Sequence, residues 1–247
     1  GIPANARSVL KISPGGKVTT IGDLPAGKNK WYGGLPGNDG CIYGIPYNAE
    51  SILKINPLTQ EVSLLGDFPS GNWKWHGGVV GEDGAIYGIP SHAESVLKIV
   101  PSTGEISLLG NLSRGVFKWG GGASGGDGFV YGFPNDAESV LKIETSTGEV
   151  SLDDRVKVPG PAKWQGGMMA RDGCLYAIPD KADHVLKIVP HLQDVSLVGK
   201  PFIGRFKWQG AVLAEDGVVY GLPSRAKSVL KISPPAKTQK KLPEAVQ

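Results

Sequence analysis

Residues 74–90 read Lys-Trp-His-Gly-Gly-Val-Val-Gly-Glu-Asp-Gly-Ala-Ile-Tyr-Gly-Ile-Pro, and variants of this stretch recur along the whole chain. The closing Tyr-Gly-Ile-Pro element, or a near copy of it, ends at prolines spaced 44, 44, 45 and 44 residues apart: Pro46, Pro90, Pro134, Pro179 and Pro223. A truncated copy, Gly1-Ile2-Pro3, opens the chain. A fixed period of this length is typical of repeat proteins in which each unit stacks on its neighbours.

Each period contains four strand-like segments. Residues 75–80 and 85–89 are joined by Glu82-Asp83-Gly84, where Asp-Gly supplies the positive φ that a tight hairpin requires. Residues 95–99 and 105–109 follow, joined by a Pro-Ser-Thr-Gly turn. Four short strands in a repeat of this length predict one blade of a β-propeller.

We therefore predict an all-β fold, a single β-propeller of four-stranded blades over residues 1–236, followed by a basic C-terminal tail at 237–247. The repeats start near residues 1, 31, 75, 119, 164 and 208. Segments of Val-Leu-Lys-Ile type favour six blades, the first supplied by residues 1–22 as three outer strands; they begin at Val9, Ile52, Val96, Val140, Val185 and Val229. Because only five Lys-Trp strands are present, five blades is the alternative, and a longer parent chain with more blades is the third.

The consensus Asp-Gly-x-Ile-Tyr-Gly-Ile-Pro, followed by Val-Leu-Lys-Ile-x-Pro-x-Thr-Gly-Glu-Val, resembles the repeats of NHL, YVTN and kelch-like propellers over nearly the entire chain. It is most similar to uncharacterised kelch-like repeat proteins. In outline it also resembles five-bladed lectins of the tachylectin type, with their Gly-x-Leu-Tyr-Gly strands. The resemblance implies a propeller fold and leaves the ligand open.

Two rows of repeated residues are candidate ligand contacts at the entrance of each inner strand. The tryptophans are Trp31, Trp75, Trp119, Trp164 and Trp208, and each follows a lysine, namely Lys30, Lys74, Lys118, Lys163 and Lys207. A ring of lysines at one channel mouth would attract an anion or an acidic sugar, and a ring of indoles would stack on sugars. The alternative is that the indoles fill the space between blades while each lysine pairs with a neighbouring carbonyl or acid.

Other recurrent residues are more simply explained by folding. One aspartate precedes glycine in every Asp-Gly turn, and one aspartate per turn is too few for calcium, so turn chemistry explains the pattern. A lysine inside each third strand, such as Lys98, is expected to pair with an acid four residues upstream, such as Glu94. We expect Cys41 and Cys174, at equivalent repeat positions far apart in a ring, to be reduced and buried, which favours a reducing compartment or an organelle interior.

The sequence predicts binding rather than catalysis. The four histidines occupy unrelated repeat positions without metal spacing, and no nucleophile or phosphate-loop motif is present. Because the blade spacing is even, we expect no enzyme, and the residues suggest no cofactor or metal. We expect instead a platform that docks a protein partner, as a subunit of a larger assembly, with a contact rim formed by the lysine row and the loops at 47–48, 91–92, 135–136, 180–181 and 224–225. A multivalent lectin is the alternative, and a hydrolase or lyase, which would need acids and histidine gathered at one mouth, is the third.

Charge and hydropathy restrict the partners further. The formal net charge of +3 comes from interspersed acids and bases, so no nucleic-acid partner is expected. No apolar run approaches the ~18 residues of a membrane span. An anionic ligand or a glycan at the channel mouth remains compatible with the lysine row.

Overall fold

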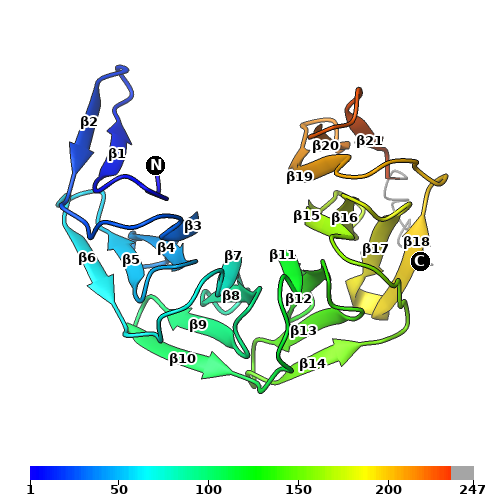
Figure 1. The fold of residues 1–247 in the computed structure, drawn as a ribbon, viewed down its shortest axis with the longest axis horizontal. Coiled ribbons are helices and arrows are strands. Elements are labelled where there is room, and N and C mark those ends of the chain that lie inside the picture. Colours follow the sequence, from blue (N-terminus) through cyan, green and yellow to red (C-terminus); the bar gives the residue numbers. More distant parts are fainter. Residues whose placement is uncertain (235–247) are drawn as a thin grey trace, which may run out of the picture.

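The computed structural model describes residues 1–234 and arranges them as six antiparallel sheets that follow one another along an open arc (Figure 1). The first sheet pairs β1 (Val9–Ile12) with β2 (Val18–Ile21). The prediction of an all-β propeller with six blades is confirmed. The first blade was expected to have three outer strands, and that detail is wrong: residues 1–3 form no strand, although Gly1 and Leu10 exchange backbone hydrogen bonds.

The next four sheets each contain four strands in sequence order. They are β3 (Trp31–Pro36), β4 (Ile42–Pro46), β5 (Ile52–Ile55) and β6 (Val62–Leu65); β7 (Trp75–Val80), β8 (Ile86–Pro90), β9 (Val96–Val100) and β10 (Glu105–Leu109); β11 (Trp119–Ser124), β12 (Phe129–Pro134), β13 (Val140–Glu144) and β14 (Val150–Asp153); β15 (Trp164–Met169), β16 (Leu175–Pro179), β17 (Val185–Val189) and β18 (Asp194–Val198). The sixth sheet contains β19 (Trp208–Leu213), β20 (Val219–Pro223) and β21 (Leu230–Ile232). The predicted tail at 237–247 lies outside the described residues.

The innermost strands approach one another closely, which explains their glycines. Each of these strands has a register shift after its tryptophan, as between Trp164 and Gly167. Gly166 takes a positive φ of 75° at this bulge, and a Cβ there would come within 2.9 Å of the Cα of Gly210 in the next blade. Only glycine combines this conformation with so close a backbone contact.

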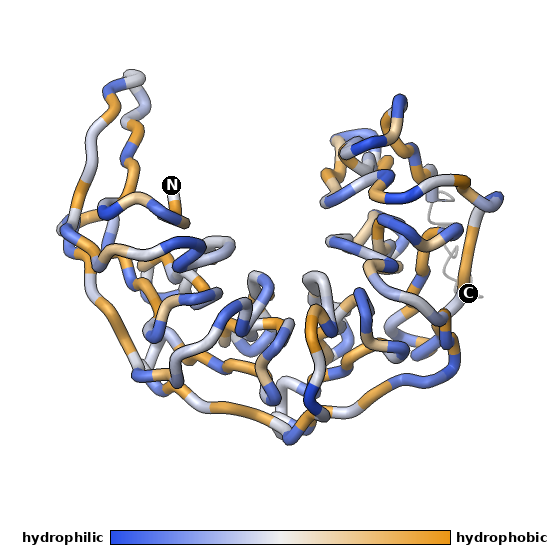
Figure 2. Tube along the Cα trace, in the orientation of Figure 1, coloured by the Kyte–Doolittle hydropathy of each residue, from blue (hydrophilic) through white to orange (hydrophobic). Residues whose placement is uncertain are grey.

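Apolar side chains between successive sheets form the core, and hydrophobic segments recur in every sheet along the arc (Figure 2). The Ile of Tyr-Gly-Ile-Pro, or its substitute, is fully buried in the second to fifth sheets: Ile45, Ile89, Phe133 and Ile178. In the sixth sheet Leu222, at the same position, is 49% exposed, because no described blade covers that side. Each blade thus depends on the next for burial of its apolar face.

The Asp-Gly turns are stabilised as the sequence indicated. Asp83 Oδ1 accepts a hydrogen bond from Ala85 N (3.2 Å), and its Oδ2 accepts one from the Tyr87 hydroxyl (2.8 Å). The strand lysine Lys98 pairs with the same carboxylate at 3.4 Å. The expected pairing of Lys98 with Glu94 is therefore wrong; the third-strand lysine instead reaches the turn of its own blade, and Lys54 does the same with Asp39 (2.9 Å).

Alternation of strand direction places the loops on two faces. The Asp-Gly turns and the turns after β5, β9, β13 and β17 lie on one face, the last containing the short helix η1 (Pro190–Leu192). The loops after β4, β8, β12, β16 and β20, and the segments leading into each inner strand, lie on the other, which we call the axial face. No helix in residues 1–234 has the length and apolarity needed to cross a membrane.

Candidate functional site

The row of lysines lies inside the protein, between blades. All five residues are buried, at 2–8% exposed: Lys30, Lys74, Lys118, Lys163 and Lys207. Lys118 Nζ donates to Ala93 O (2.6 Å) of the preceding blade and to Ser113 O (3.1 Å). Burial lowers the pKa of each of these ammonium groups. Four of the five lysines donate to a carbonyl of the preceding blade, whereas Lys163 Nζ donates to Gly160 O (2.8 Å) in the segment leading into its own inner strand. A role of the row in ligand binding stays a prediction.

The row of tryptophans is equally enclosed. Every indole is buried and donates Nε1–H to a carbonyl twenty residues further along, as Trp119 does to Ser139 O at 2.9 Å. The same bond is made by Trp31, Trp75, Trp164 and Trp208. The indoles therefore fill the interior of the sheets, and Trp119 alone among them reaches the axial pocket described below.

A continuous line of backbone hydrogen bonds organises the axial face. Ser91 N donates to Lys74 O (2.9 Å), and Lys118 N in turn donates to Ser91 O (3.0 Å). The same alternation continues through the residue after each proline, which is Tyr47, Ser91, Asn135, Asp180 or Ser224. These residues begin the loops expected to form the contact rim, and the structure places them along one continuous line on the axial face.

The residue before each lysine adopts a left-handed backbone conformation. The φ values lie between 48° and 56° at Asn29, Trp73, Phe117, Ala162 and Phe206. In three repeats the backbone N–H of this residue is bound by an Asn or Asp of the preceding blade, as Trp73 N is by Asn48 Oδ1 (2.8 Å). The left-handed region is unfavourable for bulky residues, so Trp73, Phe117 and Phe206 are held on the axial face at some conformational cost.

Six of the rings on this face form one contiguous aromatic cluster, made of Tyr32, Tyr47, Trp73, His76, His92 and Phe117. Ring centroids lie 4.3 Å apart for Tyr32 and His76, 4.7 Å for Trp73 and Phe117, and 4.8 Å for His92 and Phe117. Tyr32 and Phe117 are also exposed. The cluster is thus an apolar surface that remains open to a ligand.

The cluster borders a cavity of about 340 Å³, which we call the axial pocket. Its lining comes from five successive blades and includes Tyr47, His76, Ser91, Phe117, Trp119, Gly120, Asn135, Asp136, Pro161, Ala162, Gln165, Asp180, Lys181, Phe206 and Gln209. Apolar walls with a few converging polar groups are the usual composition of a ligand site. The axial pocket is therefore our candidate functional site.

Asp180 is the most unusual residue of this lining. The residue is 1% exposed, and its Oδ1 has no hydrogen-bond partner within residues 1–234. Oδ2 is only 3.5 Å from Gln209 Nε2, at the limit for a hydrogen bond. Burial raises the pKa of this carboxyl. A buried carboxylate oxygen without a donor is costly, and such groups concentrate at functional sites.

The two histidines of the cluster have different environments. Burial lowers the pKa of His76 to about 4, so its imidazole is neutral at pH 7. His92 packs edge-on against Trp73 and Phe117, and its Nε2 has no partner in the described part of the chain. The sequence analysis placed His92 in the predicted rim loop 91–92 without a role for its ring, and it missed His76, because the two histidines occupy different repeat positions. The only available signal for the cluster was that Trp73 and Phe117 share aromatic character next to the lysine row.

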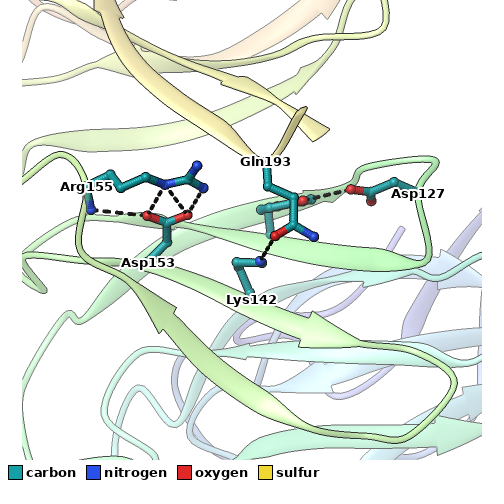
Figure 3. Close-up of polar contacts among 6 residues, drawn as sticks. Asp127, Lys142, Asp153, Arg155 and Gln193 are labelled. Carbon is teal, nitrogen blue, oxygen red and sulfur yellow. Dashed lines mark hydrogen bonds and ion pairs between the residues drawn. The ribbon is translucent and has the colours of Figure 1, made fainter. Parts of the chain in front are cut away.

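A polar cluster away from the axial pocket lies near the outer strands of the fourth and fifth sheets, and its side chains are hydrogen-bonded to one another (Figure 3). Arg155 binds the Asp153 carboxylate through its backbone N–H (3.1 Å) and its guanidinium. Lys142 Nζ donates to Gln193 Oε1 (2.9 Å) in the next blade. The Lys142 bond joins two blades, and the Arg155 bonds neutralise the Asp153 carboxylate within one of them.

Two further cavities occupy equivalent places between loops of the axial face. One of about 770 Å³ lies between the segments leading into β3 and β7, and includes Lys30 and Glu50. The other, of about 480 Å³, lies between the segments leading into β15 and β19 and includes Lys163 and Asp183. Within residues 1–234 no cluster of three His, Cys, Asp or Glu side chains is arranged for a metal ion, and Cys41 and Cys174 are buried and unpaired.

Comparisons with solved structures agree with the fold. A streptogramin B lyase is 20% identical, with a TM-score of 0.71, over 88% of this chain and 70% of that one. A catalytically inactive virginiamycin B lyase from Staphylococcus aureus, solved with quinupristin, is 16% identical, with a TM-score of 0.73 over 92% and 74% of the two chains. The extracellular domain of a putative one-component system from B. thetaiotaomicron is 9% identical, with a TM-score of 0.57 over 81% and 27%. No family model and no curated protein matches the chain.

These likenesses confirm the β-propeller and correct one expectation. The expectation that the chain is not an enzyme is wrong, because propellers of this fold include lyases, and a regular repeat therefore does not exclude catalysis. That expectation also assumed that no acids and histidine meet at one mouth, whereas the axial pocket contains His76, Asp136 and Asp180. The NHL-like and kelch-like type stays a prediction.

Proposed function

We propose that the protein binds a peptide segment of a partner protein in the axial pocket. The observation that carries this proposal is the aromatic cluster at the rim, in which Trp73 and Phe117 are fixed in left-handed conformations beside a cavity. Exposed aromatic residues dominate the binding energy of protein interfaces, because a rigid ring loses little entropy when it is covered.

The strain at these positions supports a role beyond folding. In its own blade Asn29 occupies the same left-handed position, and asparagine tolerates this conformation well. An aromatic residue is less favourable there by about 1 kcal/mol or more. The presence of aromatic residues at positions 73 and 117 is therefore better explained by a binding role on the axial face than by the stability of the loop.

The test is selection of a displayed random peptide library on the full chain, followed by calorimetric titration of the selected peptides. The informative variant carries Trp73→Asn and Phe117→Asn together, because Asn29 proves that asparagine fits the backbone. The matched control is Leu58→Asn, which removes a 90% exposed leucine from the opposite face. We expect the double variant to weaken binding about tenfold or more, as for loss of interface hot spots, and Leu58→Asn to leave it unchanged.

Two results would overturn the proposal. Peptides that bind the wild type and the double variant equally would place the contact elsewhere, including on the Lys and Trp rows. Retention of glycans with several sites per chain, and of no peptide, would instead support the multivalent lectin, whose sites would be the two equivalent cavities beside Lys30 and Lys163.

A lyase is the second candidate, favoured by the structural likeness to streptogramin B and virginiamycin B lyases. Asp180 and His76 would be the acid and base groups of the same pocket, since burial raises the pKa of the first and lowers that of the second. Incubation with quinupristin, followed by chromatography, tests it. Consumption by the wild type that is lost in Asp180→Asn supports a lyase, and an unchanged substrate removes quinupristin from consideration.

A further inference from the structure

We infer that Asp180 determines the specificity of the axial pocket by binding a cationic nitrogen of the ligand, an ammonium or a guanidinium group. This inference rests on the proposed peptide-binding function and deepens it, since lysine and arginine side chains and a free N-terminus supply such a group. The starting observation is that Asp180 lines the cavity and is only 1% exposed, yet its Oδ1 has no hydrogen-bond partner in residues 1–234.

Comparison within the repeat shows that folding alone does not require a carboxylate here. Asn135 occupies the equivalent position in the preceding blade and donates from Nδ2 to Trp164 O (3.3 Å). By repeat position the corresponding carbonyl in the next blade belongs to Trp208, and an ionised carboxylate has no hydrogen to donate to a carbonyl. An asparagine would satisfy the site internally, so the aspartate leaves an oxygen for a donor that comes from outside.

The neighbouring cations of the protein are engaged elsewhere. Lys181 Nζ lies 4.6 Å from the centroid of the Phe206 ring, and the Arg225 guanidinium lies 4.8 Å from it. Lys207 Nζ donates to Ala182 O (2.9 Å) and Gly204 O (3.1 Å). None of these three side chains, all in the described part of the chain, makes a hydrogen bond to Asp180, whose carboxylate therefore remains available.

A free carboxylate oxygen favours a cation over a neutral donor, although Lys207 and Arg225 also act on Asp180 from outside the pocket lining. The lining contains two carboxylates and one ammonium group, and one carboxylate, Asp136, already accepts a bond from Ala162 N (2.7 Å). Bonds between a cationic donor and a carboxylate are roughly twice as strong as neutral ones. Phe117 and Trp119 line the same pocket, and aromatic rings attract a cation that lies over their faces.

A small probe tests the inference without any selected peptide. Benzylamine carries an aromatic ring and an ammonium group, and benzyl alcohol has a similar shape without the charge. Binding of each to the full chain is followed by tryptophan fluorescence and by heteronuclear NMR, for the wild type and for Asp180→Asn. We expect benzylamine to bind the wild type at least about tenfold more tightly than benzyl alcohol, and this preference to vanish in Asp180→Asn.

The Asp180→Asn variant is expected to fold, because the introduced amide would copy the Asn135 bond, and its unfolding midpoint should equal or exceed that of the wild type. Selected peptides supply the second arm, in which Lys is replaced by norleucine, Arg by citrulline, or the N-terminus is acetylated, to identify the source of the cation. Equal binding of the two probes to the wild type, or an unchanged preference in Asp180→Asn, overturns the inference. Peptides that need Trp73 but carry no required cation would overturn it while leaving the proposed function intact.

Discussion

Asn135 Nδ2 donates a hydrogen bond to the carbonyl oxygen of Trp164, 3.3 Å away in the next blade. This bond attaches the loop after β12 to the inner strand β15, at the rim of the axial pocket. The residue is 9% exposed, so the bond is made away from water. Asp180 occupies the same position in the next blade, but its carboxylate cannot donate this bond. The same repeat position therefore holds a structural contact in one blade and a candidate binding group in the next.

Replacement of Asn135 by aspartate should therefore destabilise the protein. The carboxylate would lose the bond to Trp164 O and bury a charge without a donor, at a cost of about 1–3 kcal/mol. Urea denaturation followed by tryptophan fluorescence measures the change. Asn135→Ser is the control, since Ser91 and Ser224 occupy the position in other blades; a loss as large as that of Asn135→Asp would mean that the charge is not responsible.

Replacement of Lys118 by methionine tests whether the lysine row serves the fold. The variant keeps the apolar stem but leaves Ala93 O and Ser113 O without their ammonium donor. We expect a loss of about 2–3 kcal/mol in the free energy of unfolding, as for bonds to charged groups. The exposed Lys200→Met is the control and should change little. Unchanged stability of Lys118→Met, together with weaker ligand binding, would instead favour the lysines as ligand contacts.

Replacement of Ala162 by glycine should stabilise the protein, which is unusual for a change to glycine. Ala162 has a φ of 54°, and glycine adopts this conformation without steric cost. The relief of strain is partly offset by the greater entropy of the unfolded chain, which leaves a gain of about 0.5 kcal/mol. Thermal unfolding measures it. Ala182→Gly, at a buried position without a positive φ, is the comparison and should destabilise.

The sequence allowed the blades to be predicted because their determinants are local and repeated. The Asp-Gly turns, the bulge glycines and the Tyr-Gly-Ile-Pro strands recur in almost every copy, so each copy supports the assignment of the others. The partners of the strand lysines were predicted wrongly because sequence distance is not spatial distance. Four residues upstream of Lys98 is Glu94, but strand pairing brings the lysine to Asp83 in a different turn.

The axial pocket was only partly predictable, because its groups break the repeat. The rim loops were correctly placed together, since they all follow the same proline. Asp180 becomes a candidate only when it is compared with Asn135, which makes a hydrogen bond at the equivalent position. His76 becomes a candidate only because its ring contacts the rings of Tyr32 and Tyr47. Such groups are defined by neighbours in other blades, which spacing along one chain does not reveal.

The neutral imidazole of His76 predicts a pH dependence of stability. Burial lowers its pKa from 6.5 to about 4, so the unfolded chain binds a proton in this range more readily than the folded protein. The contribution of His76 to stability is therefore complete above pH 6.5 and is lost as the pH falls toward 4, by up to about 3 kcal/mol. His76→Gln, which copies Gln165 and Gln209 at equivalent positions, should remove this slope from urea denaturation measured between pH 7 and 4. His191→Gln, at an exposed position on the opposite face, should leave the slope in place; an identical slope in the wild type and in His76→Gln would show that His76 does not titrate with a lowered pKa.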